Sequence, residues 1–249
     1  MLRLLYQDEH YIAVYKPSGL LVHRSMIDRH ETQFALQMAR DLIGQRVYPV
    51  HRLDKPTSGV LLFALSSQAA NRLMTRFADG EIDKEYLAVV RGYTEEKGVI
   101  DYALVEERDR IADAMSDPNP APQNATTHYS RLATVEFERP VGRYSTARFS
   151  LVRVSPKTGR RHQIRRHLRH IFHPVLCDTT HGDGKQNRFF KNHLGADRLM
   201  LSATRVSFMH PYSKQRTTVN AFPDERFTRV TGACGWDLAA LLATATATG

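Results

Sequence analysis

The leading candidate for chemistry in this sequence is one carboxylate, Asp54, in the string HRLDKPTSG at residues 51–59. The string has the pattern of a strand end and a tight loop before the apolar run at residues 60–65. A carboxylate fixed in such a loop can act as a nucleophile or a general base when burial and a nearby cation tune it. The alternative is structural, because Asp often closes a turn by bonding its own backbone two residues on. The spacing alone leaves both interpretations open.

A basic segment, GRRHQIRRHLRH, supplies candidate cations. It predicts a helix over residues 160–172, with apolar residues at i, i+4 and i+7 from Ile164. Arg165 flanks this apolar stripe, so its guanidinium could enter a half-buried site and hold a carboxylate. The alternative is a structural arginine at the edge of the core. Arg166 and Arg169 lie further round the helix and are expected to face solvent or a ligand.

Histidines gather in the same region and suggest a zinc site. The candidate ligands are His162, His167, His170, His173, Cys177 and His181. Arginines interleave with these histidines and would repel a cation, and no CxxC or HExxH pattern accompanies them. We therefore predict no metal site.

The elements that must position these residues are mixed and irregular. Strand patterns fall at residues 11–15, 60–65, 85–91, 129–137, 146–154 and 198–209, and helical patterns at 32–42 and 68–78, the latter capped by Ser66 or Ser67. Residues 112–127 and 181–197 are predicted loops, and residues 238–249 a frayed tail. The set indicates an α+β fold, a largely antiparallel mixed sheet flanked by helices and loops, as a single domain over residues 1–249.

Composition and charge limit the class of molecule that the protein is expected to bind. The chain has 249 residues and a formal net charge of +9, which favours a polyanion, either nucleic acid or an anionic membrane surface. No apolar run reaches 18 residues, and the basic segment lacks an aromatic apolar face, so we expect no membrane association. Two cysteines are too few for a disulfide framework and are typical of the reducing cytoplasm.

Four motifs form an ordered set along most of the chain. They are HRLDKPTSG at 51–59, KEYLAVVRG at 84–92, KTGRRHQIRRH at 157–167, and RLMLSA at 198–203 followed by His-Pro at 210–211. This set resembles the HRLDxxTSG, KxYxAxVxG, GRxHQIRxH and RLxLHA…HP motifs of the RluA-type pseudouridine synthases. The chain departs from that family at CDTTHG, residues 177–182, where GDxxYG is common, and at Leu-Ser-Ala in place of LHA. We also expect no S4 RNA-binding module, which often precedes the catalytic domain in this family.

The resemblance implies a pseudouridine synthase fold and an isomerase that needs no cofactor. It implies that Asp54 is the catalytic carboxylate and that Arg165 holds it. Tyr86 would stack on the uracil and assist removal of the C5 proton, and Arg52 would fill the gap left by a flipped uridine. The further residues expected to contact RNA are His51, Arg160, Arg161, His162, Arg166 and Arg169.

A finer resemblance points to tRNA as the partner. The string YQDEHYIAVYKPSGLLVHRS at residues 6–25 and the HGDGKQNR segment at 181–188 resemble a branch of the family that modifies uridine 65, in the acceptor and T-stem region of tRNA. Two alternatives stay open: a ribosomal RNA pseudouridine synthase, and an RNA-binding factor that keeps the fold without catalysis. No obligate protein partner is implied, and we expect a monomer.

Overall fold

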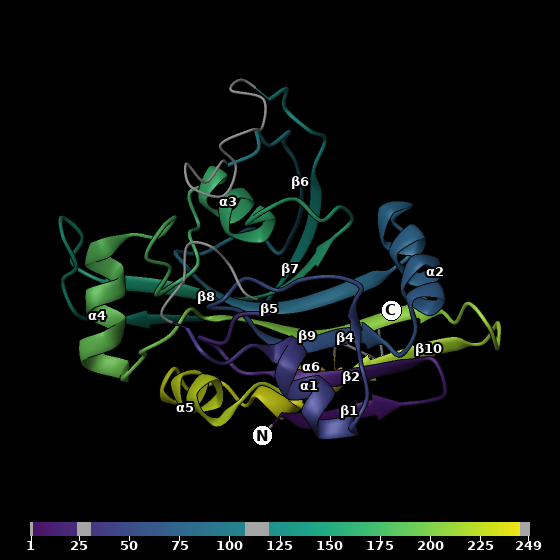
Figure 1. Ribbon diagram of the computed structural model, residues 1–249. Coiled ribbons are helices and arrows are strands. Elements are labelled where there is room, and N and C mark those ends of the chain that lie inside the picture. Colours follow the sequence, from purple (N-terminus) through teal and green to yellow (C-terminus); the bar gives the residue numbers. More distant parts are fainter. Residues whose placement is uncertain (1, 24–30, 108–119, 245–249) are drawn as a thin grey trace.

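The computed structural model describes residues 2–23, 31–107 and 120–244, built around one ten-stranded sheet (Figure 1). The strands are β1 (Arg3–Gln7), β2 (Tyr11–Lys16), β3 (Tyr48–Pro49), β4 (Ser58–Ala64), β5 (Asp83–Arg91), β6 (Lys97–Asp101), β7 (Thr126–Phe137), β8 (Ala147–Pro156), β9 (Leu201–Met209) and β10 (Arg216–Asn220). The helices are α1 (Ala35–Ile43), α2 (Ser67–Ala78), α3 (Gln163–His170), α4 (Gly184–Leu194), α5 (Glu225–Ala233) and α6 (Leu238–Thr244). The α+β expectation is confirmed.

The sheet runs β1-β2-β4-β9-β5-β8-β7-β6, with β3 on β4 and β10 on β9. The pairing of β4 with β9 is parallel, and the other strand pairs are antiparallel. The β4–β9 pair therefore joins the two halves of the sheet. Backbones approach closely there: Gly59 has φ +116°, and a Cβ at this position would lie 2.0 Å from the carbonyl oxygen of Ala203. Only glycine fits that place.

Alternating side chains cover both faces of the central strands. On β2, Ile12 and Val14 pack with α1, while Tyr11 and Ala13 pack with α2 on the opposite face. Because both faces are covered, β4 is buried along its whole length, as its continuous apolar run predicts. Figure 1 shows α2 and α3 over one face of the sheet and α1, α5 and α6 over the other. No helix within the described residues is both long and apolar enough to span a bilayer.

Most of the expected elements are present. The strand expected at 11–15 is β2, the helix at 32–42 is α1, and the helix at 68–78 is α2, where the Ser66 side chain accepts a hydrogen bond from the Ala69 N–H. The helix expected over 160–172 is shorter, because His162 at its start has a left-handed backbone, with φ 55°.

Two expectations at the C-terminal end are wrong. Residues 181–197 are not a loop, because α4 occupies most of them. The Asp183 side chain caps its first turn, Gly195 ends it, and Phe189 and Phe190 bury its inner face. Part of the expected frayed tail, residues 238–244, is α6, and Leu238 packs in the core. Residues 245–249, and 112–119 of the other expected loop, lie outside the described residues.

Candidate active site

The loop that carries Asp54 lies between β3 and β4, and hydrogen bonds from the turn after β2, residues 16–19, hold it in place. The Gly19 N–H donates to the Lys55 carbonyl at 2.8 Å, and the Ser18 hydroxyl donates to the Pro56 carbonyl at 2.7 Å. The turn itself is closed by main-chain atoms, since the Thr57 N–H donates to the Asp54 carbonyl oxygen at 3.0 Å. The Asp54 carboxylate is therefore not required to close the turn, and it points instead toward α3.

The Lys16 side chain links the turn after β2 to the loop that carries Asp54. Its buried ammonium donates to the carbonyls of Pro17, Leu20 and Lys55 at 3.1, 2.7 and 3.0 Å. Burial lowers the pKa of Lys16 to about 7, and the negative charge of Asp54 opposes that shift. The KPSG string at residues 16–19 is a turn signal in the sequence, but it indicates no role for the lysine.

Arg165 is the centre of the site. Its Nε and Nη2 donate to the Asp178 carboxylate at 2.7 and 2.8 Å, and its Nη1 donates to Asp54 at 3.2 Å. Only 4% of Arg165 is exposed, against 19% of the Asp54 side chain. One buried guanidinium thus holds two carboxylates, of which Asp54 is the more exposed. The expectation that Arg165 enters a half-buried site beside Asp54 agrees with this geometry.

Asp178 is the carboxylate that the sequence did not single out. It lies in the CDTTHG segment, after α3, and also accepts from the N–H groups of Thr180 and His181 at 2.9 Å each. Burial alone would raise the pKa of Asp178, but the bonds from Arg165 and from these backbone groups outweigh it and lower that pKa. Asp178 therefore stays charged and fixes the plane of the arginine.

Tyr86 lies beside this group through the strand register. Ala203 on β9 pairs with Gly59 on one side and with Tyr86 of β5 on the other. Two strand spacings of about 4.8 Å therefore separate Tyr86 from the end of the Asp54 loop. Burial, and then the negative charge of Asp54, raise the pKa of Tyr86 above its ordinary value. Its hydroxyl therefore stays protonated at neutral pH and can donate a hydrogen bond, and its ring packs against two clusters of the core.

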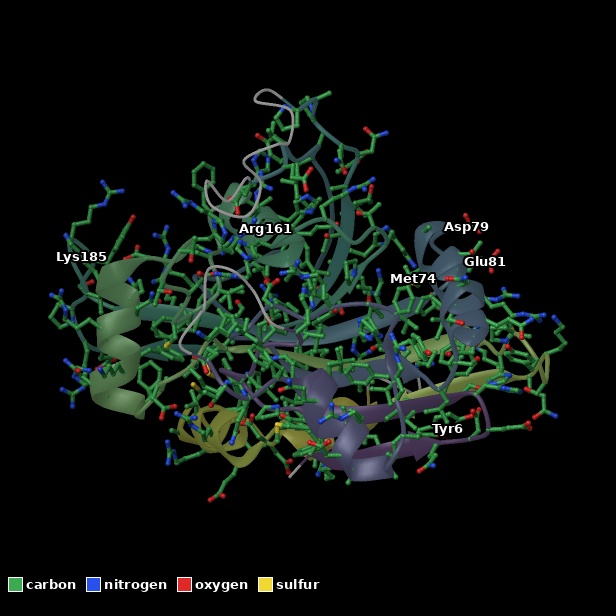
Figure 2. The ribbon with its side chains drawn as sticks, viewed as in Figure 1. Tyr6, Met74, Asp79, Glu81, Arg161 and Lys185 are labelled. Carbon is green, nitrogen blue, oxygen red and sulfur yellow. The ribbon has the colours of Figure 1, made fainter. Side chains whose placement is uncertain are left out.

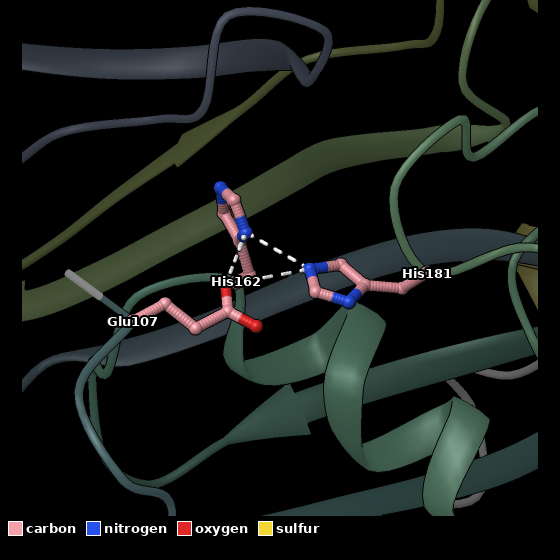
Figure 3. Close-up of side chains that lie close together, drawn as sticks. All are labelled: Glu107, His162 and His181. Carbon is pink, nitrogen blue, oxygen red and sulfur yellow. Dashed lines mark hydrogen bonds and ion pairs between the residues drawn. The ribbon is translucent and has the colours of Figure 1, made fainter. Parts of the chain in front are cut away.

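Glu107, His162 and His181 form a second cluster, next to Asp54 (Figure 3). His162 Nδ1 lies 3.0 Å from both Glu107 Oε2 and His181 Nε2, and His162 Nε2 lies 4.0 Å from Asp54 Oδ2. Burial is the main cause that lowers the pKa of both histidines, so the imidazoles are neutral near pH 7. The three donor atoms lie within 4.8 Å of one another and could hold a divalent cation.

The surroundings favour a hydrogen-bonded network over a metal site. Arg161 donates to the Glu107 carbonyl at 2.7 Å, and Arg166 Nε lies 3.5 Å from its carboxylate. The Arg166 guanidinium already pairs with the Glu107 carboxylate, and the positive charges of both arginines oppose a further cation. His167 and His173, two of the candidate zinc ligands that the sequence offered, bond the backbone carbonyls of Tyr102 and Arg91. Nothing in the sequence marked Glu107.

The expected RNA contacts differ in how accessible they are. Arg52 and Arg169 are exposed. His51 is enclosed: its Nε2 accepts from the Leu62 N–H at 2.9 Å, its ring stacks on Phe77, and burial lowers its pKa to about 3. The imidazole of His51 therefore supports β4, and any contact of this residue with RNA would have to come from other atoms.

The polar face of α3 is partly covered by the chain itself. Arg166 was expected to face solvent, but it donates to the Val105 carbonyl at 2.8 Å, and Arg160 donates to the Asn124 carbonyl at 3.2 Å. Figure 2 labels Arg161 beside α3, where it holds the Glu107 carbonyl. These side chains anchor segments of their own chain, a role that helix periodicity could not reveal.

Known proteins match the chain along its length. Residues 10–170 match the family model described as RNA pseudouridylate synthase. A protein of Vibrio cholerae named tRNA pseudouridine synthase C is 50% identical and covers 97% of this chain and 99% of its own length. A protein of the same name from Pasteurella multocida is 53% identical, with 95% of this chain and 98% of that protein covered.

A solved structure shows the same architecture. Human RNA pseudouridylate synthase domain containing 1 superposes with a TM-score of 0.72 at 23% identity, over 100% of this chain and 96% of that one. At this identity the likeness speaks for the fold alone, whereas the family model and the relatives from bacteria speak for common descent. The expected resemblance is confirmed, and the chain belongs to the RNA pseudouridylate synthase family.

Proposed function

We propose that the protein isomerises a uridine of tRNA to pseudouridine. The observation that carries the proposal is the position of Asp54. Arg165 holds it as the more exposed carboxylate of a buried ion-pair network, and Tyr86 lies beside it. The names of the matched relatives, tRNA pseudouridine synthase C, support tRNA as the substrate.

The reaction breaks the bond between C1′ of the ribose and N1 of the uracil, turns the base, and forms a bond between C1′ and C5. The proton on C5 leaves as the new bond matures, and N1 gains a proton, so atoms and charge balance without an oxidant or reductant. Asp54 acts as the carboxylate next to the sugar, and the hydrogen bond from Arg165, at 3.2 Å, holds it in place. The protonated Tyr86 hydroxyl and ring position the uracil at the site.

A uridine inside a stem must leave the stack to reach this site, at a cost of a few kcal/mol. The exposed Arg52 precedes Asp54 by two residues, and we propose that its side chain occupies the vacated position. We propose uridine 65 as the target on the strength of the sequence resemblance to the tRNA branch. We also propose a monomer of one domain that works in the cytoplasm, where the free thiols of Cys177 and Cys234 persist.

The test is pseudouridine mapping on total tRNA after incubation with the purified protein, together with tritium release from 5-tritiated uridine RNA. Asp54→Asn should abolish both signals and leave RNA binding intact. Asp197→Asn is the matched control, since Asp197 pairs with Arg226 at the surface. Turnover by Asp54→Asn would refute catalysis through this carboxylate. Modification of ribosomal RNA alone would favour the ribosomal alternative, and RNA binding without any modification by the wild-type protein would favour the non-catalytic one.

A further inference from the structure

A cavity of about 400 Å³ lies at the end of the sheet beside α4, away from Asp54. Its walls come from the turn after β5, the hairpin between β7 and β8, and the first turn of α4. The residues that matter for its chemistry are Arg91, Tyr93, Tyr144, Arg148 and Gln186. None of them belongs to the site around Asp54.

Two exposed tyrosines and two arginines form the mouth of this cavity. Tyr93 and Tyr144 are 40% and 49% exposed, which is high for aromatic side chains of a folded protein. The Arg148 guanidinium lies 5.4 Å from the centre of the Tyr93 ring, and that of Arg143 lies 5.1 Å from the Tyr144 ring. Exposed rings combined with cations are the arrangement on which single-stranded nucleic acid stacks.

The charge around the cavity is positive. Asp183 pairs with Arg91 at 2.9 Å, and Glu136 pairs with Arg148 at 3.0 Å, so each carboxylate is matched by one arginine. Arg143 and Lys185 add two further cations. Lys185 lies over the turn at Gly142, and Figure 2 shows it at the edge of the molecule beside α4. The excess suits a phosphate backbone.

Among the described residues, one buried side-chain oxygen beside this cavity lacks a hydrogen-bond donor. Gln186 lines the cavity and is 6% exposed, and its Oε1 has no hydrogen-bond partner among the described residues. An amide oxygen that is buried without a donor costs free energy. The exocyclic amino group of a nucleobase is a donor of the right kind, whereas a bare phosphate offers none.

We propose that this cavity binds an unpaired nucleotide of the RNA substrate, with its base against Tyr93 and Tyr144 and its phosphate near Arg143 and Lys185. A base in a duplex stays stacked on its neighbours, so only an unpaired nucleotide can present a free face to the rings. The inference rests on the proposed function, because it assigns a second contact to the same RNA. The segment from Asp178 to Gln186 connects the two sites directly along the chain.

Fluorescence anisotropy with a labelled six-nucleotide single strand of adenosine and cytidine tests the inference. The strand contains no uridine, so its binding does not depend on the isomerisation site, and Asp54→Asn should bind it as the wild type does. Tyr93→Ala and Tyr144→Ala should each weaken binding about tenfold, in line with the loss of one stacked base. Tyr93→Phe and Tyr144→Phe keep the rings and should retain the affinity. Phe222→Ala, at an aromatic residue that is 48% exposed and does not line the cavity, should have no effect.

With the full RNA substrate, the two alanine variants should raise KM and leave kcat unchanged. Equal affinity of the wild type, both alanine variants and Phe222→Ala for the single strand would overturn the inference. An equal loss of affinity for an RNA duplex would also overturn it, because the cavity would then be a duplex phosphate contact. Neither result would bear on whether Asp54 catalyses the isomerisation, so the two proposals fail separately.

Discussion

Replacing Asp178 with Asn isolates the contribution of the buried ion-pair network. The substitution keeps the shape of the side chain but removes its charge, and it turns one acceptor of Arg165 into an NH₂ group. Arg165 is then a buried cation whose remaining carboxylate partner is Asp54, at 3.2 Å. Breaking a buried ion pair in this way costs about 3–5 kcal/mol. That is a large share of the roughly 5–15 kcal/mol that stabilises a typical protein, although it leaves the chain folded at 25 °C when the total is near the upper end.

Urea unfolding, followed by the fluorescence of the one tryptophan, Trp236, measures the loss. Asp197→Asn is the control: Asp197 makes the same kind of bidentate pair with Arg226, but at the surface, where the expected cost is below about 1 kcal/mol. Because the guanidinium is no longer held in plane, we also expect kcat of Asp178→Asn to fall about 100-fold.

The pH dependence of this loss of stability tests the charge of Asp178. The pKa of Asp178 is lower in the folded than in the unfolded protein, so its contribution is complete above about pH 4 and is lost as pH falls through the folded pKa. The difference in stability between wild type and Asp178→Asn should therefore shrink in acid. A loss as small as that of Asp197→Asn, or a difference that grows in acid, would refute the assignment of Asp178 as the charged anchor of Arg165.

Three further substitutions test residues that hold the loop and strands around the site in place. Lys16→Met removes the donor from three carbonyls and should cost about 3 kcal/mol in urea unfolding. Since the folded pKa is about 7, the stability of the wild type relative to this variant should rise between pH 7 and 10. His51→Phe leaves the Leu62 N–H without an acceptor and should cost about 1–3 kcal/mol at pH 8. That cost should shrink below about pH 6.5, where wild-type unfolding gains a proton on the histidine. Gly59→Ala places a methyl group against the backbone of β9 and should prevent folding or lower Tm steeply, whereas Gly235→Ala, in open space, should cost about 1 kcal/mol. Unchanged unfolding curves for these variants would contradict the contacts described.

Sequence periodicity predicted the elements that have one dominant pattern. The continuous apolar run at residues 60–65 favoured a buried strand, and the stripe in residues 68–78, with Ser66 or Ser67 before it, favoured a capped helix. Helix α4 was missed because its polar residues resemble a loop, and its helical stripe is limited to Phe189 and Phe190. Its stability comes from packing those two rings into the core, which no local pattern encodes.

The sequence by itself determined the chemistry available to this protein. It determined that a carboxylate follows a strand end at Asp54, that an arginine flanks the apolar stripe of a basic helix, and that the whole chain carries an excess of positive charge. These follow from residue type and spacing, which act over a few neighbouring residues.

Only the tertiary structure decided which of these groups meet. Asp54 and Arg165 are 111 residues apart in sequence, and the folded sheet brings together the loop before β4, which carries Asp54, and the helix after β8, which carries Arg165. The pairing of β5 with β9 gives Tyr86 its place, while the loop after α3 delivers Asp178 to the guanidinium of Arg165. Arg166, which periodicity assigned to solvent or a ligand, instead donates to the Val105 carbonyl of its own chain, whereas Arg169 is exposed as expected. Periodicity cannot show which distant segment of the chain lies beside a helix, because it describes only neighbouring residues.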